Sequence, residues 1–186
     1  MEGVGRRLGA GGSGLLVNIG SHSLNGRERN VLFRNNADET FTDVGWVNEA
    51  DRVEDGRGLA VFDFDNNGSL DLLLRNYRMQ TGLLANRGDS RHSVSFELTG
   101  TRSNRDAVGA TLRLRSGEQW QTRVVTTGSG YLSGSSLRVH FGLGEAEKVD
   151  ELVIEWPSGE RSVFTDLAVD RMHAIREGAE FVLEGR

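Results

Sequence analysis

The apolar residues of this chain stand in runs of only three to six, and that spacing limits the folds open to it. Runs of this length, flanked by Gly, Asn and Asp, are typical of β-strands and too short for the helices of a globular protein. The 25 Gly residues and the single Pro, Pro157, indicate many tight turns between such strands. In the first half the runs occupy residues 15–19, 31–33, 59–64, 70–74 and 83–85. The sequence therefore predicts an all-β fold.

A weak internal repeat runs through this first half. Residues 14–18 echo residues 71–75, and residues 32–35 echo residues 83–86. An apolar strand followed by a second strand that ends in Asn, used twice, is typical of a propeller blade. Two copies are too few to close a propeller, so we expect incomplete propeller-type blades here.

The second half has its own set of short strands after the polar stretch at residues 100–104. Leu112 and Leu114 alternate with Arg113 and Arg115, which predicts one buried face and one wet face. We expect an antiparallel β-sandwich-like domain, whereas residues 167–177 fit either a short helix or a final strand. The expected strands are residues 110–115, 119–127, 136–141, 150–156 and 161–164.

Composition excludes several classes of function for this chain of 186 residues. There is no Cys, which excludes a disulfide scaffold, a thiol nucleophile, a Cys-ligated zinc site and an iron–sulfur cluster. No stretch of 18 apolar residues occurs, which excludes a transmembrane helix. The net charge is -5 and no basic stripe is visible, so we expect no nucleic-acid partner.

From the N-terminal residues we expect no clear signal peptide. Gly9, Gly11, Gly12 and Gly14 interrupt the apolar stretch that such a signal requires. The start at Met1 resembles the middle of a longer reading frame more than a natural secretory start. We therefore expect a fragment or a chain without a clear signal of its own.

One segment carries explicit chemistry, the pattern D-x-D-x-N-G-x-x-D at residues 63–71. Calcium needs six to eight oxygen ligands, and alternating Asp63, Asp65 and Asn67 can turn their oxygens inward as the loop curls. Gly68 would supply the sharp turn, which places the carbonyl of Ser69 and the carboxylate of Asp71 beside the same ion. Three carboxylates within nine residues repel one another when no cation is present.

The predicted ion is calcium, and the flanks of the loop are strands. An EF-hand would carry a bidentate Glu at position 74, which is Leu74 here. The alternative is a solvated turn, because Asn67-Gly68 is also a strong hairpin signal. The predicted calcium ligands are Asp63, Asp65, Asn67, Ser69 and Asp71.

The chain resembles two known families in order. Residues 58–72 resemble an FG-GAP/VCBS repeat, the blade unit of integrin-type propellers, and residues 32–36 and 40–44 resemble parts of a preceding repeat. Four later segments resemble the ASPIC/UnbV domain. These segments are SNRDAVGA at 103–110, GSGYLS at 128–133, HFGLG at 140–144 and WPSG at 156–159.

The order of repeats and C-terminal domain is similar to that of the cartilage acidic protein family and its bacterial relatives. The resemblance implies an FG-GAP/VCBS-like region at residues 1–90, with a degenerate first repeat, and an ASPIC/UnbV-like β domain at residues 91–186. It implies secreted or surface-exposed calcium-binding proteins associated with adhesion or matrix contact, without an established catalytic activity of the C-terminal domain.

Two departures from the family pattern concern the repeats. There is room for barely two of them, and residues 6–14, where a first calcium loop would lie, contain no carboxylate. We therefore expect either a fragment, or a chain whose open strand edges are covered by a partner or by a second copy of the chain.

The leading hypothesis is a non-enzymatic, calcium-stabilised interaction module outside the cytoplasm, in the extracellular space or the cell envelope. Its expected partner is a protein or a glycan at the cell surface or in the matrix. The alternative is a carbohydrate-binding accessory domain of a surface or secreted enzyme. The aromatic residues that would serve it are Trp46, Trp120, Trp156, Tyr77 and Tyr131.

Other candidates have simpler structural explanations. Ser129 lies in TGSGY, which is not the G-x-S-x-G of a nucleophile elbow, and we expect a glycine-rich turn with Tyr131 packed beyond it. A hydrolase would need a histidine or second carboxylate within reach of Ser129. His140 is expected to be a packed strand histidine, and residues 104–106 fit a structural turn better than a site.

Overall fold

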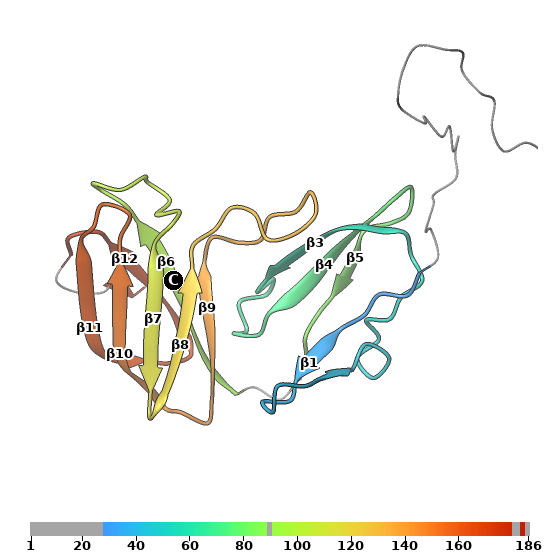
Figure 1. Ribbon diagram of the computed structural model, residues 1–186, viewed down its shortest axis with the longest axis horizontal. Helices are drawn as coiled ribbons and strands as arrows, with labels where there is room; N and C mark the ends of the chain where they lie inside the picture. The colour runs from blue at the N-terminus through green and yellow to red at the C-terminus, as the bar shows by residue number, and fades with distance from the viewer. Residues whose placement is uncertain (1–27, 89–90, 180–182, 185–186) are drawn as a thin grey trace, which may run out of the picture. The chain divides into compact units, whose positions relative to one another are not determined.

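The computed structural model describes residues 28–88, 91–179 and 183–184, and these residues form strands and turns without a helix (Figure 1). In chain order the strands are β1 (Phe33–Asn35), β2 (Phe41–Asp43), β3 (Gly56–Phe62), β4 (Asp71–Asn76), β5 (Gly82–Leu84), β6 (His92–Thr99), β7 (Thr111–Ser116), β8 (Gln119–Val124), β9 (Val139–Gly144), β10 (Lys148–Glu155), β11 (Arg161–Ala168), β12 (Arg171–Arg176) and β13 (Leu183–Glu184).

The described residues fall into two compact units. The first contains residues 28–56 and 76–79, and the second contains residues 57–75 and everything described from residue 80 onward. In the first unit β1 and β2 form an antiparallel hairpin, with Phe33 opposite Asp43. Phe33, Phe41 and Trp46 are exposed, so this unit has little apolar core of its own within the described residues.

The second unit begins with a three-stranded sheet in the order β3-β4-β5. β4 and β5 are antiparallel, with Leu73 opposite Leu83. A propeller blade has four strands, so this sheet is one strand short of a blade within the described residues. The predicted strands at 59–64, 70–74 and 83–85 are all present, displaced by a few residues at their ends.

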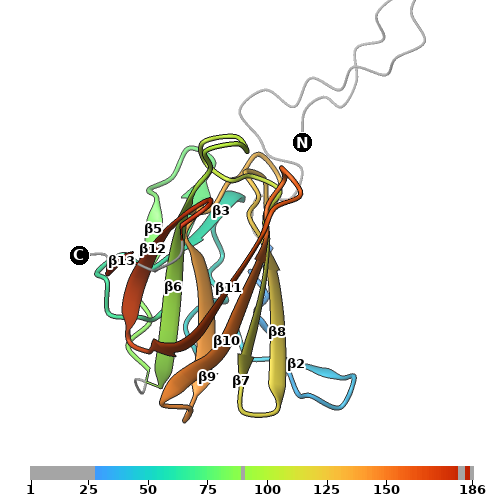
Figure 2. The ribbon, with the colours of Figure 1, turned by 90° about the vertical axis from the view of Figure 1, so that its left-hand side faces the viewer.

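The rest of the second unit is a sandwich of two four-stranded sheets, in the orders β11-β10-β7-β8 and β13-β12-β6-β9 (Figure 2). Their facing side chains form one core that excludes water, and Phe96 and Phe141 meet edge to face at its centre with ring centroids 5.9 Å apart. The predicted alternation is confirmed, because Leu112 and Leu114 are fully buried. Burial of such alternating apolar positions is what stabilises the two sheets against each other.

Two predicted turns close hairpins in the sandwich. Gly117 adopts a φ of 60° between β7 and β8, and Gly159 a φ of 87° between β10 and β11. In the second turn the Trp156 N–H donates to the Glu160 carbonyl at 2.9 Å. Both glycines occupy the left-handed region, which residues with a side chain adopt only at a cost.

Two features of the sandwich differ from the sequence prediction, and one open choice is decided. β6 was not among the expected strands, although its residues from Val94 to Thr99 alternate between buried and more exposed positions. Of the two alternatives for residues 167–177, the strand is correct, since they contain the end of β11 and the whole of β12. β12 pairs with β6 in parallel, whereas the other pairs of the two sandwich sheets are antiparallel. A parallel pair needs a long crossover, and here the chain between β6 and β12 contains all four strands of the opposite sheet.

The expected all-β fold class, with incomplete blades followed by a β-sandwich, is confirmed. The predicted strand at 15–19 lies outside the described residues. The division into domains at residues 1–90 and 91–186 stays a prediction. Nowhere in the described part of the chain is there a helix with the length and hydropathy that a membrane crossing requires.

A buried carboxylate joins two of the sequence motifs inside the sandwich. Glu177, directly after β12, is 3% exposed and accepts hydrogen bonds from the backbone N–H groups of Thr101, Arg102 and Ser103, each at 2.7 Å. Its other oxygen accepts from the hydroxyls of Ser103 and Ser158. The segments SNRDAVGA and WPSG therefore meet at one side chain that the sequence did not single out.

These hydrogen bonds decide the ionisation of Glu177. Burial raises the pKa of the carboxyl, but the donors from Ser103, Ser158 and Thr101 lower it by more, so its pKa lies well below the usual value of 4.5. A carboxylate with a lowered pKa in the folded state stabilises the fold above its unfolded pKa. That stabilisation is lost as the pH falls from about 4.5 through the folded-state value.

Glu177→Gln is expected to lower the melting temperature by several degrees at pH 7, because an amide cannot accept all five of these hydrogen bonds. The variant should also lose less stability than the wild type as the pH falls below 4.5. Thermal melts across pH measure both effects. The control is Glu145→Gln, whose side chain is 90% exposed; equal melting temperatures for the two variants at pH 7 would contradict the role of Glu177.

Candidate metal centre

The predicted calcium loop is the connection between β3 and β4. β3 ends at Phe62 and β4 begins at Asp71, so residues 63–70 turn the chain between two neighbouring strands, as expected. The carboxylates of Asp63, Asp65 and Asp71 converge there, with one oxygen of each lying within 4.8 Å of the others. The loop thus gathers three negative charges at one end of the sheet.

Two of these carboxylates also hold the loop together. Asp63 accepts hydrogen bonds from the N–H groups of Asn67 and Gly68, at 3.0 and 2.9 Å. Asp71 is 1% exposed and accepts from the N–H groups of Phe64 and Asn86, each at 2.7 Å. Each carboxylate oxygen can accept more than one partner, so these bonds leave room for a metal ion.

The remaining predicted ligands are placed differently. Asp65 is exposed and forms none of the described hydrogen bonds, so only the path of the loop backbone positions its carboxylate in the cluster. Asn67 turns its side-chain oxygen to the Ser69 N–H at 2.8 Å. The roles of Asn67 and of the Ser69 carbonyl as ligands stay predictions.

The donor set fits a hard divalent cation. Two oxygens bound to one calcium ion at 2.3–2.6 Å lie at most about 5 Å apart, and the three carboxylates meet that limit. All the converging donors are oxygens, which suit Ca²⁺, Mg²⁺ or Mn²⁺ better than zinc or copper. The three carboxylates leave further positions for backbone carbonyls or water.

The loop stands on the outer face of the sandwich sheet that contains β6 and β9. The carbonyl of Gly68 lies 2.8 Å from Nε2 of His140 on β9. A carbonyl only accepts, so Nε2 carries the proton and donates. Nη1 of Arg138 donates to the side-chain oxygen of Asn66 at 3.0 Å. A Cβ on Gly68 would approach Oγ of Ser93 on β6 to 2.8 Å.

The exposed edge of β3 is also covered from within the chain. Oγ of Ser133 accepts from the Leu59 N–H at 2.9 Å, and Oγ of Ser135 accepts from the Val61 N–H at 3.1 Å. Both serines belong to the long loop between β8 and β9, which extends to β3 (Figure 1). Serine hydroxyls thus satisfy edge N–H groups that would otherwise invite pairing with another strand.

These supporting residues were not identified from the sequence. His140 was expected to be a packed strand histidine, and it is half-buried but bonded to the loop. Local patterns do not show what His140, Arg138 or Ser135 contact, because their partners lie more than 70 positions away. A cleft of about 500 Å³ borders the loop, lined by Asp63, Asn66, Ser95, Arg138 and His140 among others.

The other candidate residues have separate places. Oγ of Ser129 lies 3.0 Å from Oγ of Ser135, and no hydrogen bond among the described residues joins Ser129 to a histidine or carboxylate. Tyr131 is 73% exposed, so the expectation that it packs beyond the glycine-rich turn was wrong. The turn at residues 128–133 contacts β3 through the hydroxyl of Ser133, while Tyr131 points into solvent. Asn104 bonds the backbone of Val108 twice, at 2.8 Å each, as a structural turn.

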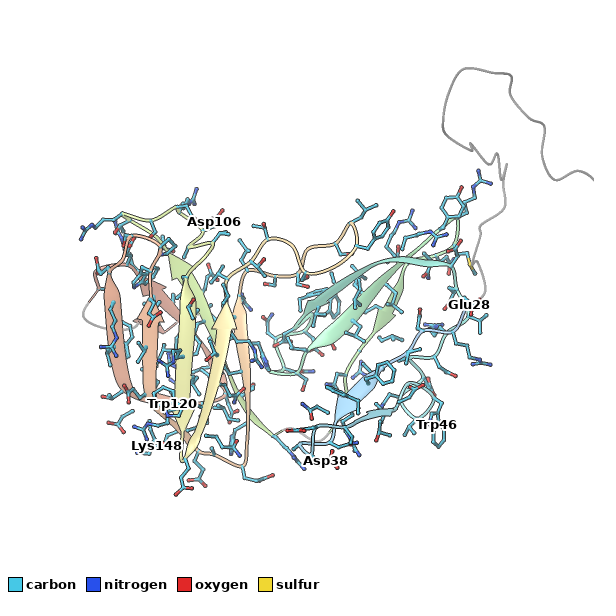
Figure 3. All side chains as sticks on the ribbon, in the orientation of Figure 1. Glu28, Asp38, Trp46, Asp106, Trp120 and Lys148 are labelled. Carbon is cyan, nitrogen blue, oxygen red and sulfur yellow. The ribbon has the colours of Figure 1, made fainter. Side chains whose placement is uncertain are left out.

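The three tryptophans differ in exposure. Trp156 is 3% exposed and donates to Ser162 inside the sandwich, whereas Trp46 is exposed in the first unit. Trp120, labelled in Figure 3, lies on β8 and is 46% exposed. The guanidinium carbons of Arg113 and Arg115 lie 5.3 and 5.8 Å from the centre of its ring.

Comparison with known families and proteins matches the two halves of the chain separately. Residues 16–74 match the FG-GAP-like repeat, and residues 100–181 match the family described as ASPIC and UnbV. Cartilage acidic protein 1 of Mus musculus is 34% identical over 140 residues, and that of Homo sapiens is 33% identical over the same length. These matches cover 70% of this chain and 21% of each relative, so the chain spans about a fifth of their length.

Gly68→Ala is expected to destabilise the protein for two reasons. Its φ of 87° penalises any side chain, and its Cβ would overlap Ser93. The control is Gly117→Ala, where φ is 60° but no atom lies within 4 Å of the new Cβ. We expect the control to lose about 1–2 kcal/mol of unfolding free energy, and Gly68→Ala to lose about 0.5–1.5 kcal/mol more, because Oγ of Ser93 must turn away from the new Cβ.

Urea unfolding of the two variants measures this difference. Adding Ser93→Gly to Gly68→Ala should restore only the part caused by the overlap. Equal losses in the two single variants would contradict the predicted overlap between residue 68 and Ser93.

Proposed function

We propose that this chain, which carries an FG-GAP-like repeat region followed by an ASPIC and UnbV region, is a non-enzymatic calcium-binding interaction module that acts outside the cytoplasm. The convergence of Asp63, Asp65 and Asp71 within 4.8 Å supports this proposal most directly. The metal would be held by these carboxylates, with Asn67 and Ser69 completing the set. A bound ion would neutralise the loop and stabilise the folded state by mass action.

Calcium is favoured over magnesium by the shape of the site. The loop is irregular and includes Asn66 at a φ of 56° and Gly68 at a φ of 87°. Calcium accepts such uneven surroundings with six to eight oxygens, whereas magnesium demands a near-ideal octahedron. Extracellular modules bind calcium at about 10⁻⁴–10⁻³ M, so the ion would be structural in a calcium-rich compartment.

The partner is proposed to be a protein or a glycan of the cell surface or matrix. The relatives that match this chain are named for cartilage, which supports a place outside cells. The exposed apolar side chains of the first unit, Phe33, Phe41 and Trp46 among them, would be covered in a longer assembly, by preceding repeats or by a second copy.

A second candidate function is carbohydrate binding on the outer face of the sheet β11-β10-β7-β8. Trp120 lies opposite Arg115 in the β7–β8 register and beside Arg113. An exposed indole can stack on a sugar ring while guanidinium groups pair with a carboxylate or sulfate on it. The favoured ligand in this case is an acidic polysaccharide.

Asp65→Asn is expected to weaken calcium binding by about tenfold or more, because it removes a charged ligand. The melting temperature without calcium should stay the same or rise slightly. Asp65 makes no described hydrogen bond, and the loss of its charge relieves repulsion among the loop carboxylates. Isothermal titration with calcium, and with magnesium in parallel, measures the affinity. Glu118→Gln, at an exposed position in the β7–β8 turn, serves as the control.

Calcium binding that is equal in wild type and Asp65→Asn would contradict the proposed site. Absence of binding at several millimolar calcium in the wild type would remove the proposed function itself. Magnesium binding as tight as calcium binding would show that the loop is a divalent-cation site without the proposed preference for calcium.

Trp120→Ala is expected to abolish retention on an immobilised uronic-acid polysaccharide if the second candidate is correct. Trp46→Ala, which removes an equally large exposed ring from the first unit, should bind as the wild type does. Affinity electrophoresis in gels with acidic and neutral polysaccharides measures the retention. Migration of the wild type that does not change in either gel would eliminate this candidate.

A further inference from the structure

We infer that His140 and Arg138 are positioning residues for the calcium loop, so that the β-sandwich sets the calcium affinity of the repeat and calcium in turn stabilises the sandwich. The inference rests on the proposed function, since it concerns the same loop. In this role the ASPIC and UnbV region supports the metal site without contributing a ligand to it. Both residues lie within residues 100–181, and the loop lies within residues 16–74.

The bond from His140 acts on the backbone at the turn of the loop. Nε2 donates to the Gly68 carbonyl at 2.8 Å, between the predicted ligands Asn67 and Ser69. Gly68 also donates its N–H to Asp63. The peptide groups on both sides of the Gly68 α-carbon are therefore tied, one to a ligand carboxylate and the other to β9.

Arg138 holds the neighbouring residue. Its guanidinium donates to Asn66 at 3.0 Å and lies 3.8 Å from the carboxylate of Glu97 on β6. Asn66 has a φ of 56°, in the left-handed region that Asn adopts more readily than most residues with a side chain, and the bond to Arg138 adds to what holds it there. The positive charge also lies beside a loop that carries three carboxylates, which offsets part of their repulsion.

Further contacts fix the base of the loop on the same sheet and on the β8–β9 loop. Gly68 lies close enough to Ser93 that a Cβ would be 2.8 Å from its hydroxyl. Ser133 and Ser135 bond the edge of β3, the strand that leads into the loop. The loop is therefore held from β6, from β9 and from the segment before β9.

These contacts imply thermodynamic coupling between the loop and the sandwich. If β9 stabilises the loop conformation in which the carboxylates converge, less of the binding energy of calcium is needed to order the loop. By linkage, calcium must then stabilise the contacts of His140 and Arg138 to the same extent. The two-way effect distinguishes positioning from mere packing.

The test compares His140→Leu with His140→Gln in the full chain. Leu removes the donor, whereas the side-chain amide of Gln can place an N–H near the position of Nε2. The matched control is Gln121→Leu, which removes a side-chain hydrogen bond to the Gly142 carbonyl of β9 without touching the loop. Calcium affinity is measured by titration, and hydrogen exchange of the amides of residues 66–69 is measured without calcium.

We expect His140→Leu to weaken calcium binding by about three- to tenfold, the loss of one hydrogen bond, and to speed exchange in the loop even without metal. His140→Gln should restore most of both effects, and Gln121→Leu should change neither. In the wild type, calcium should slow exchange in β9 and in the loop before it.

Several results would overturn the inference. An unchanged affinity and unchanged loop exchange in His140→Leu would do so while leaving the proposed function intact. An equal loss of affinity in Gln121→Leu would show general destabilisation in place of positioning. A wild type that binds no calcium would defeat the proposed function and the affinity part of the inference, and the exchange without metal would still decide whether β9 holds the loop.

Discussion

The mutual repulsion of three carboxylates is the constraint on which the second unit depends. Two unit charges 4.8 Å apart repel by about 1 kcal/mol in bulk water and by about 3–4 kcal/mol at the effective dielectric near a protein surface. Backbone N–H groups offset this for Asp63 and Asp71, whereas Asp65 has no such help among the described contacts. A cation at the centre would convert the same geometry from a cost into a stabilising contact.

The sandwich meets this constraint with contacts that lie outside the loop. β9 supplies a donor to the turn, Arg138 supplies a positive charge, and Ser133 and Ser135 close the edge of β3. A short three-stranded sheet is marginal by itself, and these contacts join it to a sandwich that has a full apolar core. The sheet β3-β4-β5 and the sandwich thus pack together within the second unit, so a metal ion bound by the loop would be expected to stabilise the sandwich as well.

The sequence predicted the local features well. Short apolar runs and Gly-containing turns were enough to find β3, β4, β5 and most of the sandwich, and the D-x-D-x-N-G-x-x-D pattern located the cluster of carboxylates. β6 was not predicted because it includes the small polar residues Ser93 and Ser95, which interrupt the run of apolar residues expected of a strand. The parallel pairing of β12 with β6 is a property of the whole topology and leaves no trace in either strand.

What the sequence could not predict is the set of long-range polar contacts. Glu177 occupies an unremarkable position after a strand, and only folding brings the three N–H groups of residues 101–103 around it. His140 was expected to be a packed strand histidine because it lies in an alternating strand beside Phe141. Its outward direction on β9 becomes meaningful only when the loop rests above it. Such partners are distant in the chain, so local patterns do not reveal them.

Scanning calorimetry of this chain, with about 1 mM calcium and with calcium removed, shows whether metal binding in the loop stabilises the sandwich. Calcium, and not magnesium, should raise the melting temperature of the sandwich by several degrees, with the loop and the sandwich melting in one transition. A sandwich transition at the same temperature with and without calcium would contradict this prediction.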